Sequence, residues 1–286
     1  MAGLPFVAPP DPRPRTPRLK LPAGACDTHV HVFGPTARFP LDPKRPYDVA
    51  DHPVEELVAL HDTVGLSRAV IVHTLLHDAN HDYLADATSR HPGRFRVIAR
   101  PEPTASDATL EALERAGTVG IRVTHRITPR PDERFLARLA ERGWHIQFFY
   151  STEEQALDWA ALLRRVPGDI VIDHMGGPDP AQGLDGKGFR VTLGLLEAGK
   201  AWVKLSGAYR FSKQPALPWS DMSPFVRKFV ATAPERLLWG SDWPHPDHHG
   251  VMPNDGDLVD LIAEWLPDEA LRRKVLVDNP ARLFRF

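Results

Sequence analysis

Cys26-Asp27-Thr28-His29-Val30-His31-Val32-Phe33-Gly34 is the stretch from which the fold can be worked out. Side chains of a strand alternate between its two faces, so a strand here predicts Asp27, His29 and His31 on one face. Residues two apart on a strand lie roughly 6–7 Å from each other, so two imidazoles can converge on one ion, water or substrate oxygen. The alternative is a pair of histidines in an ordinary strand, and the rest of the chain must decide.

The composition limits which kinds of protein this can be. The 286 residues include 42% hydrophobic and 25% charged residues, which is typical of a soluble globular protein. A net charge of −2 gives no indication of nucleic acid or an anionic membrane as a partner. The single cysteine, Cys26, excludes an internal disulfide framework and a cysteine-rich zinc site. No apolar run approaches the roughly 20 residues of a membrane span, so we expect a cytoplasmic protein.

The chain divides into an arm and one domain. Residues 1–22 contain several prolines and no apolar signal-peptide core, which predicts an extended N-terminal arm. Residues 23–286 are expected to form a single catalytic domain, because single α/β barrels commonly have this length. After the first strand, residues 35–50 form a proline-rich loop that is long enough to be a candidate binding loop.

Strand-like and helical segments alternate along the domain. After the first strand, the expected strands are Ala69–His73, Phe95–Ala99, Val119–Val123, Trp144–Phe149, Asp169–His174, Ala201–Leu205 and Leu237–Asp242. Eight strands that alternate with helices predict a parallel sheet, and eight is the number that closes a (β/α)8 TIM barrel. An open, doubly wound α/β sheet is the alternative, but no Gly-x-Gly-x-x-Gly turn follows the first strand.

Polar residues stand at the ends of several expected strands, where barrel enzymes place their sites. His29 and His31 end the first strand, His174 ends the sixth and Asp242 ends the eighth. Three histidines and an aspartate at equivalent places predict a catalytic site. A nucleophilic serine is disfavoured because the sequence has no Gly-x-Ser-x-Gly elbow.

These residues resemble the amidohydrolase superfamily, and within it most closely the 2-pyrone-4,6-dicarboxylate lactonase group. The resemblance rests on Asp27-x-His29-x-His31, on His174 in Ile-Asp-His-Met-Gly, and on Asp242 in Trp-Gly-Ser-Asp-Trp-Pro-His-Pro. It extends from about Pro22 to the end of the sequence. It implies an amidohydrolase-like (β/α)8 barrel and hydrolysis of a lactone, as in the catabolism of aromatic compounds.

The resemblance also bears on metal binding. Imidazole and carboxylate donors suit zinc or manganese, but a dinuclear site needs a bridging ligand near the end of the fourth or fifth strand. The sequence has Arg122 and Phe149 there. The lactonase group works without metal, so we expect that no cofactor is required. One divalent ion, Zn or Mn, bound by His29, His31 and Asp242 is the alternative.

The expected mechanism has Asp242 as the general base that activates water, while His29, His31 and His174 polarise the lactone carbonyl. The planar fork of arginine recognises carboxylates in bidentate fashion, so arginines near the strand ends suit a small anionic substrate. The residues expected to bind the substrate are Arg122, Arg126, Arg130, Arg210, His73, His77 and Tyr150.

Three departures from the lactonase pattern concern substrate recognition. Leu75 replaces a small hydroxyl residue, Thr128 takes the place of a second arginine, and Phe149 takes that of a tyrosine. The substrate therefore stays open among a pyrone dicarboxylate, a muconolactone, a sulfonated relative and a sugar-acid lactone. A single-metal decarboxylase or hydratase acting on a small carboxylic acid is the rival function, and a barrel that only binds an anion is a third. We expect a monomer or a small homo-oligomer.

Overall fold

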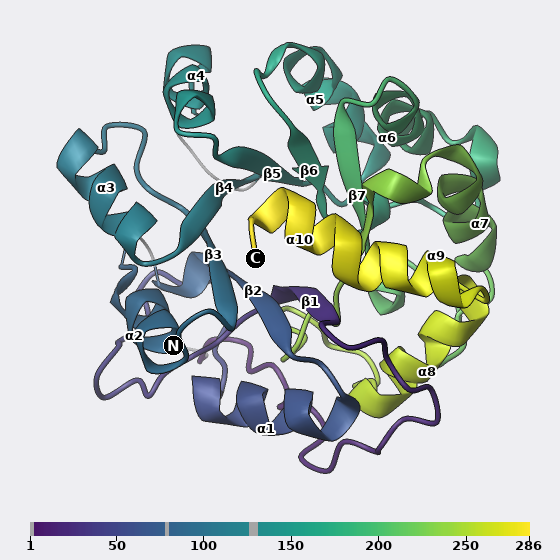
Figure 1. Cartoon of the computed structure of the whole chain (residues 1–286), viewed down its shortest axis with the longest axis horizontal. Helices are drawn as coiled ribbons and strands as arrows, with labels where there is room; N and C mark the ends of the chain where they lie inside the picture. The colour runs from purple at the N-terminus through teal and green to yellow at the C-terminus, as the bar shows by residue number, and fades with distance from the viewer. Residues whose placement is uncertain (1–2, 78–79, 126–130) are drawn as a thin grey trace.

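The computed structural model describes residues 3–77, 80–125 and 131–286. Within them, eight parallel strands pair in sequence order around a barrel (Figure 1). The strands are β1 (Cys26–Val30), β2 (Arg68–Val72), β3 (Phe95–Ala99), β4 (Thr118–Thr124), β5 (His145–Phe149), β6 (Ile170–Ile172), β7 (Ala201–Leu205) and β8 (Leu237–Trp239). The predicted (β/α)8 fold is confirmed.

Helices surround the strands, and the last helix lies across one end of the barrel (Figure 1). The helices are α1 (Val54–Val64), α2 (Asp82–Arg90), α3 (Asp107–Arg115), α4 (Glu133–Glu141), α5 (Glu153–Arg165), α6 (Lys187–Glu197), α7 (Ser223–Thr232), α8 (Asp255–Trp265), α9 (Glu269–Arg273) and α10 (Asn279–Phe284). The Phe284 ring of α10 lies 5.3 Å from the ring of His145, the first residue of β5. The amino ends of the strands are therefore covered. None of these helices has the length and apolar character needed to cross a bilayer.

The strands bury both of their faces, as the apolar runs predict. In β2, Val70 and Val72 pack inside the barrel, whereas Ala69 and Ile71 pack against the surrounding helices. The interior cluster comprises Cys26, Val70, Val72, Ile98, Val119, Val171, Trp202, Leu238 and Phe284. These apolar side chains fill much of the barrel interior, and the buried side chains of His29, His174 and Asp242 lie toward its carboxyl end.

The first and last strands meet through the residues that follow them. The amide of Asp242 donates to the carbonyl of His29 at 2.9 Å, and the amide of His31 donates to the carbonyl of Trp243 at 2.8 Å. The Thr28 hydroxyl adds a bond of 2.8 Å to the carbonyl of Trp239 in β8. The barrel is therefore closed by backbone atoms of the expected catalytic residues.

The arm lies on the barrel. Its residue Val7 is buried against Phe33, Tyr47 and Leu76, and the Val7 amide donates to the carbonyl of Asp48 at 2.9 Å. These contacts tie the arm to the proline-rich loop after β1. The loop therefore has a fixed position above the carboxyl ends of the strands.

One prediction for β1 is wrong: Asp27 does not share a face with His29 and His31. Its Oδ2 atom lies 3.6 Å from Nε2 of His61, in helix α1 outside the barrel. The pairing of β1 with β2 is irregular between Asp27 and Val30. This irregularity breaks the strict alternation of faces and turns Asp27 outward while both histidines point inward.

Candidate active site

Four side chains converge at the carboxyl ends of the strands. His29 lies near the end of β1, His31 follows that strand, His174 follows β6 and Asp242 follows β8. The Nε2 atoms of His31, His29 and His174 lie 3.3, 3.6 and 3.8 Å from the same oxygen, Oδ1 of Asp242. All four side chains are buried. The structure thus brings together the four residues that the sequence assigned to catalysis.

Contacts at Nδ1 orient two of the rings. His31 Nδ1 lies 2.7 Å from the carbonyl oxygen of Val72, and His174 Nδ1 lies 2.8 Å from Ser206 Oγ. A carbonyl only accepts, so a neutral His31 carries its proton on Nδ1 and presents a lone pair at Nε2. The Ser206 hydroxyl can donate, so Nε2 of His174 is free to carry the proton. The two rings can therefore present opposite hydrogen-bonding character to Asp242.

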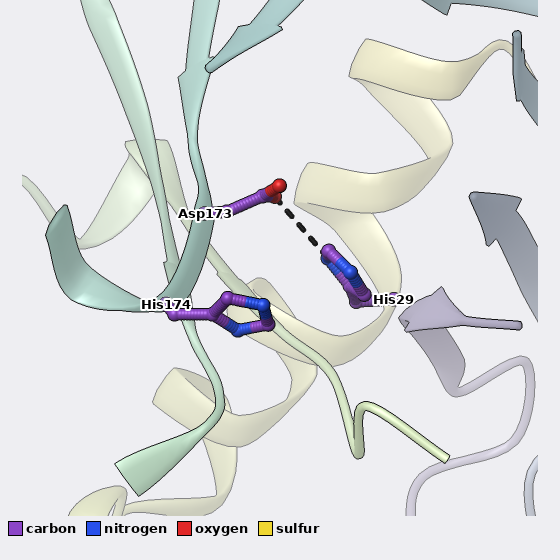
Figure 2. Close-up of side chains that lie close together, drawn as sticks. All are labelled: His29, Asp173 and His174. Carbon is purple, nitrogen blue, oxygen red and sulfur yellow. Dashed lines mark ion pairs between the residues drawn. The ribbon is translucent and has the colours of Figure 1, made fainter. Parts of the chain in front are cut away.

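His29 has two neighbours of opposite charge at Nδ1. Asp173 Oδ1 and Lys204 Nζ each lie 3.2 Å from that nitrogen, and Figure 2 shows Asp173 and His29 facing each other beside His174. Burial outweighs the attraction of Asp173 and lowers the pKa of His29 well below its ordinary value, so the ring is neutral near pH 7. A bond from Lys204 leaves the proton on Nε2, whereas a bond to Asp173 leaves a lone pair there.

A buried polar network supports these rings from inside the barrel. Asp173 Oδ2 accepts hydrogen bonds from Arg122 Nε at 3.0 Å and from Gln147 Nε2 at 3.1 Å. Lys204 Nζ donates to Gln147 Oε1 at 2.8 Å. Burial alone raises the pKa of Asp173, but His29, Lys204 and Arg122 hold it well below its usual range. Burial lowers the pKa of Lys204 to about 8. The network is therefore charged and internally paired.

Asp242 lies in a strained turn, and one of its two carboxylate oxygens accepts hydrogen bonds from neighbouring side chains. Its φ of 67° is in the left-handed region, which costs an L-residue about 1–2 kcal/mol. Its Oδ2 atom accepts hydrogen bonds from Tyr209 Oη at 2.6 Å and from Arg210 Nε at 2.7 Å. Burial alone raises the pKa of Asp242, but Arg210 and the nearby imidazoles outweigh it, so the pKa lies well below its ordinary value. Asp242 is thus ionised at neutral pH, with Oδ1 turned to the histidines.

A small cavity adjoins these groups. It has a volume of about 50 Å³ and is bordered by His31, His174 and Asp242. A surface groove of about 810 Å³ shares Phe149, Arg210 and Asp247 with it. The other residues that line the cavity are Tyr47, Thr74, Leu75, Arg122, Thr124 and Pro246. Arg122 and Arg210 therefore place two cationic side chains in its wall.

Comparison with known proteins adds the family. The model of the amidohydrolase family matches residues 26–286. The chain belongs to the amidohydrolase family. A 2-pyrone-4,6-dicarboxylate hydrolase from Comamonas testosteroni is 37% identical to it, over 95% of this chain and 93% of the relative. A 4-sulfomuconolactone hydrolase from Rhizobium radiobacter is also 37% identical, over 99% of this chain and 97% of the relative.

A solved structure agrees with these relatives. It is a probable 2-pyrone-4,6-dicarboxylic acid hydrolase from Acinetobacter baumannii with citric acid bound. The alignment has a TM-score of 0.80 at 25% identity and covers 92% of this chain and 100% of the other. The predicted resemblance to amidohydrolases and the hydrolase class are thereby confirmed.

Three of the residues expected to bind substrate do not line the cavity of this amidohydrolase. Among the described residues, Thr74 and Leu75 represent the loop after β2 in the cavity wall, while His73 and His77 are buried behind it. The His77 ring stacks on Tyr83 at 3.9 Å, so it serves packing. The loop turns after β2, which carries the two histidines away from the cavity.

The third of these residues is Tyr150. It is fully buried, and its hydroxyl lies 2.6 Å from Oγ1 of Thr192 in α6. Phe149, one position earlier, lines the cavity. Because neighbouring residues of a strand face opposite ways, Tyr150 points toward the helices.

Two of the predicted arginines cannot be placed. Arg126 and Arg130 lie outside the described residues.

The sequence analysis missed residues that only the fold brings to the site. Tyr47 comes from the proline-rich loop that was expected to bind ligand, so its general place was predicted but not its identity. Tyr209 follows β7 directly before Arg210. Gln147 and Lys204 are buried polar side chains within otherwise apolar strands, and that pattern is the one local signal that could have found them.

Three side chains of the site offer donor atoms of the kind that hold a divalent metal ion. His29, His31 and Asp242 each offer one ligand atom, and the three atoms lie within 4.8 Å of one another. Ligands about 2.1 Å from one zinc ion stand roughly 3.4 Å apart, close to the spacing here. Among the described residues, His29 Nε2 and Asp242 Oδ1 have no hydrogen-bond partner. These three residues therefore fit a single divalent ion, provided that His29 keeps its proton on Nδ1 and donates a hydrogen bond from it to Asp173.

A second metal fits less well. His29, Asp173 and His174 also offer donor atoms within 4.8 Å of one another. However, the Lys204 ammonium group lies 3.4 Å from Asp173 Oδ1 and 3.2 Å from His29 Nδ1. This cation already neutralises the donors, which disfavours a dication at the same place.

Proposed function

We propose that this amidohydrolase hydrolyses a small lactone that carries carboxylate or similar anionic groups, such as a pyrone dicarboxylate or a muconolactone. The observation that carries the proposal is that three imidazoles face one oxygen of an ionised carboxylate, beside a cavity whose wall includes Arg122 and Arg210. Two relatives with 37% identity are named for hydrolysis of such lactones, which supports the substrate class.

Asp242 is proposed as the general base. Its Oδ1 atom takes a proton from water as the water oxygen forms a bond to the lactone carbonyl carbon. Nε2 of His31 carries a lone pair when the ring is neutral, so it accepts a hydrogen bond from the same water and helps to aim it. His31 therefore acts on the water in this proposal, and not on the lactone carbonyl as expected from the sequence.

His174 and His29 are proposed to stabilise the oxyanion. Nε2 of His174 carries a proton when Ser206 donates to Nδ1, and Nε2 of His29 does so when Lys204 donates. Donors aimed at a developing negative charge in a dry site lower the barrier strongly. When the tetrahedral intermediate collapses, the ring C–O bond breaks, and the leaving oxygen takes the proton from Asp242.

Arg122 and Arg210 are proposed to bind the anionic substituents. Arg210 also neutralises Asp242, so its charge is partly used within the protein. Arg122 uses Nε for Asp173 and lines the cavity. Arg122 is therefore the main contact for a substrate carboxylate in this proposal.

The proposal needs no cofactor, and one bound metal ion is the alternative. An ion held by His29, His31 and Asp242 would act as a Lewis acid on the carbonyl. The fit of these three donors to a divalent ion also favours a second candidate function, a single-metal decarboxylase or hydratase that acts on a small carboxylic acid.

A substrate panel tests both candidates. Lactones of aromatic-ring catabolism and of sugar acids would be offered to protein purified without added metal, and ring opening would be followed in the ultraviolet. Metal content would be measured on the same preparation. Hydrolysis by metal-free protein supports the lactonase. Turnover of carboxylic acids alone, with one bound metal ion per chain, overturns it in favour of the second candidate.

A further inference from the structure

The two oxygens of Asp242 have different surroundings. Oδ1 faces the three imidazoles, whereas Oδ2 accepts hydrogen bonds from Tyr209 Oη and Arg210 Nε at 2.6 and 2.7 Å. A carboxylate can rotate about its Cβ–Cγ bond and exchange its oxygens. The donors on Oδ2 oppose that exchange, because rotation would break two charge-assisted hydrogen bonds.

Tyr209 is itself held by a residue of the turn after β8. His245 Nδ1 lies 3.2 Å from the Tyr209 hydroxyl oxygen. A phenol has one proton, and the short bond to Asp242 uses it, so the phenol oxygen accepts from the N–H of His245. The two rings meet edge to face, with centroids 5.3 Å apart and an angle of 89°. Tyr209 is therefore fixed both by a hydrogen bond and by ring packing.

The far side of the His245 ring faces a carboxylate. Its Nε2 atom lies 3.4 Å from Oδ1 of Asp255, the first residue of α8, and both side chains are buried. The turn places His245 beside the site, because the His245 amide donates to the carbonyl of Asp242 at 2.7 Å. A line of buried groups thus runs from α8 through His245 and Tyr209 to the catalytic carboxylate.

We propose that Tyr209 and His245 are positioning residues that reserve Oδ1 of Asp242 as the proton-accepting oxygen. The inference rests on the proposed function, since it assigns a task to the general base of that reaction. Burial raises the pKa of Tyr209 well above its ordinary value, so the phenol keeps its proton and remains a donor to Oδ2. His245 acts through Tyr209, because its Nδ1 atom contacts the phenol oxygen and its Nε2 atom faces Asp255 rather than Asp242.

A double-mutant cycle tests this order of action. The variants are Tyr209→Phe, His245→Asn and the double variant, with kcat and KM measured on the best lactone of the panel. Tyr209→Phe is expected to lower kcat about 10- to 100-fold, the loss typical of one hydrogen bond to a charged group, because Arg210 still holds Oδ2. KM should stay within about twofold, since neither residue is proposed to bind substrate. His245→Asn alone should lower kcat less, about 3- to 10-fold.

The decisive comparison is His245→Asn in the Tyr209→Phe background, where it should cause no further loss of kcat. Tyr150→Phe is the matched control, because it removes a buried hydroxyl bond of the same length, 2.6 Å, away from Asp242. Its kcat should equal that of the parent. Additive losses from Tyr209→Phe and His245→Asn, or an unchanged kcat in Tyr209→Phe, overturn the inference.

A second readout does not depend on turnover. In protein labelled with nitrogen-15 at histidine, the Nδ1–H of His245 should give a slowly exchanging proton resonance, assigned by its loss in His245→Asn. The resonance should move or vanish in Tyr209→Phe and stay in Tyr150→Phe. If the parent hydrolyses no lactone, the proposed function fails, and this spectrum alone then decides whether the line of hydrogen bonds exists. A resonance that is unaffected by Tyr209→Phe overturns the inference in either case.

Discussion

Arg122→Met tests whether the cavity is built for an anion. Arg122 donates a hydrogen bond from Nε to Asp173 Oδ2 at 3.0 Å. Its guanidinium carbon lies 5.0 Å from the centre of the Phe149 ring. Methionine keeps much of the aliphatic volume and removes the charge. Asp173 still accepts a hydrogen bond from Gln147 Nε2 at 3.1 Å. The fold should therefore survive, with a loss of about 1–3 kcal/mol in the free energy of unfolding.

The expected effect on catalysis is larger than that on stability. A guanidinium that binds a substrate carboxylate by one or two charge-assisted bonds contributes about 2–4 kcal/mol. At 1.36 kcal/mol for each factor of ten, kcat/KM should fall by about 30- to 900-fold. Arg122→Lys should give an intermediate value, because it keeps the charge but loses the planar fork.

The assay is steady-state hydrolysis of an anionic lactone, with urea unfolding of the same preparations. Arg236→Met is the matched control, because Arg236 pairs with Asp169 at 3.0 Å near the amino end of β8, far from the cavity. The control should lose some stability but no activity. If Arg122→Met hydrolyses its substrate as well as the parent does, Arg122 is only structural and the anion-binding role is refuted.

Three further predictions follow from the site and the core. Asp242→Asn should lower kcat by about 10²–10⁴-fold with little change in KM, and turnover within about tenfold of the parent would remove Asp242 from the mechanism. Activity should survive exhaustive chelation, whereas complete loss with recovery on adding zinc or manganese would favour the single-ion alternative. Burial lowers the pKa of His145 from 6.5 to about 3. Between these values the unfolded chain binds a proton that folded His145 does not, so the free energy of unfolding should fall with falling pH, by up to about 1.4 kcal/mol per unit. In urea titrations from pH 6 to pH 4 this slope should be shallower in His145→Asn, and an equal slope would contradict the assignment.

The barrel and the main catalytic residues could be predicted because their signals are local. Apolar runs such as Ala201–Leu205 need only their own residues to be recognised as strands, and parallel order then brings all carboxyl ends to one face. The parallel order of the strands was sufficient to predict that His29, His174 and Asp242 lie close together. It needed no knowledge of distances.

The sequence did not predict features that depend on contacts between residues far apart in the chain. Asp27 turns outward because the pairing of β1 with β2 is irregular between Asp27 and Val30. Tyr209 reaches Asp242 only because β7 and β8 are adjacent. The tautomer of each histidine depends on partners such as Ser206 and Val72, which lie on other strands. Spacing along one strand carries none of this information.

Closure of the barrel through the residues after β1 and β8 has a consequence for refolding kinetics. The bond from Thr28 to Trp239 spans 211 positions in the sequence, a high contact order that makes this junction slow to form. A partly folded chain in which β1 to β7 are ordered could already bury Trp144 and Trp159, which precede and follow β5, yet it would lack the contact of His31 with Asp242. During refolding, recovery of turnover should therefore lag behind recovery of tryptophan fluorescence. The length of this lag would measure how long β1 and β8 take to pair.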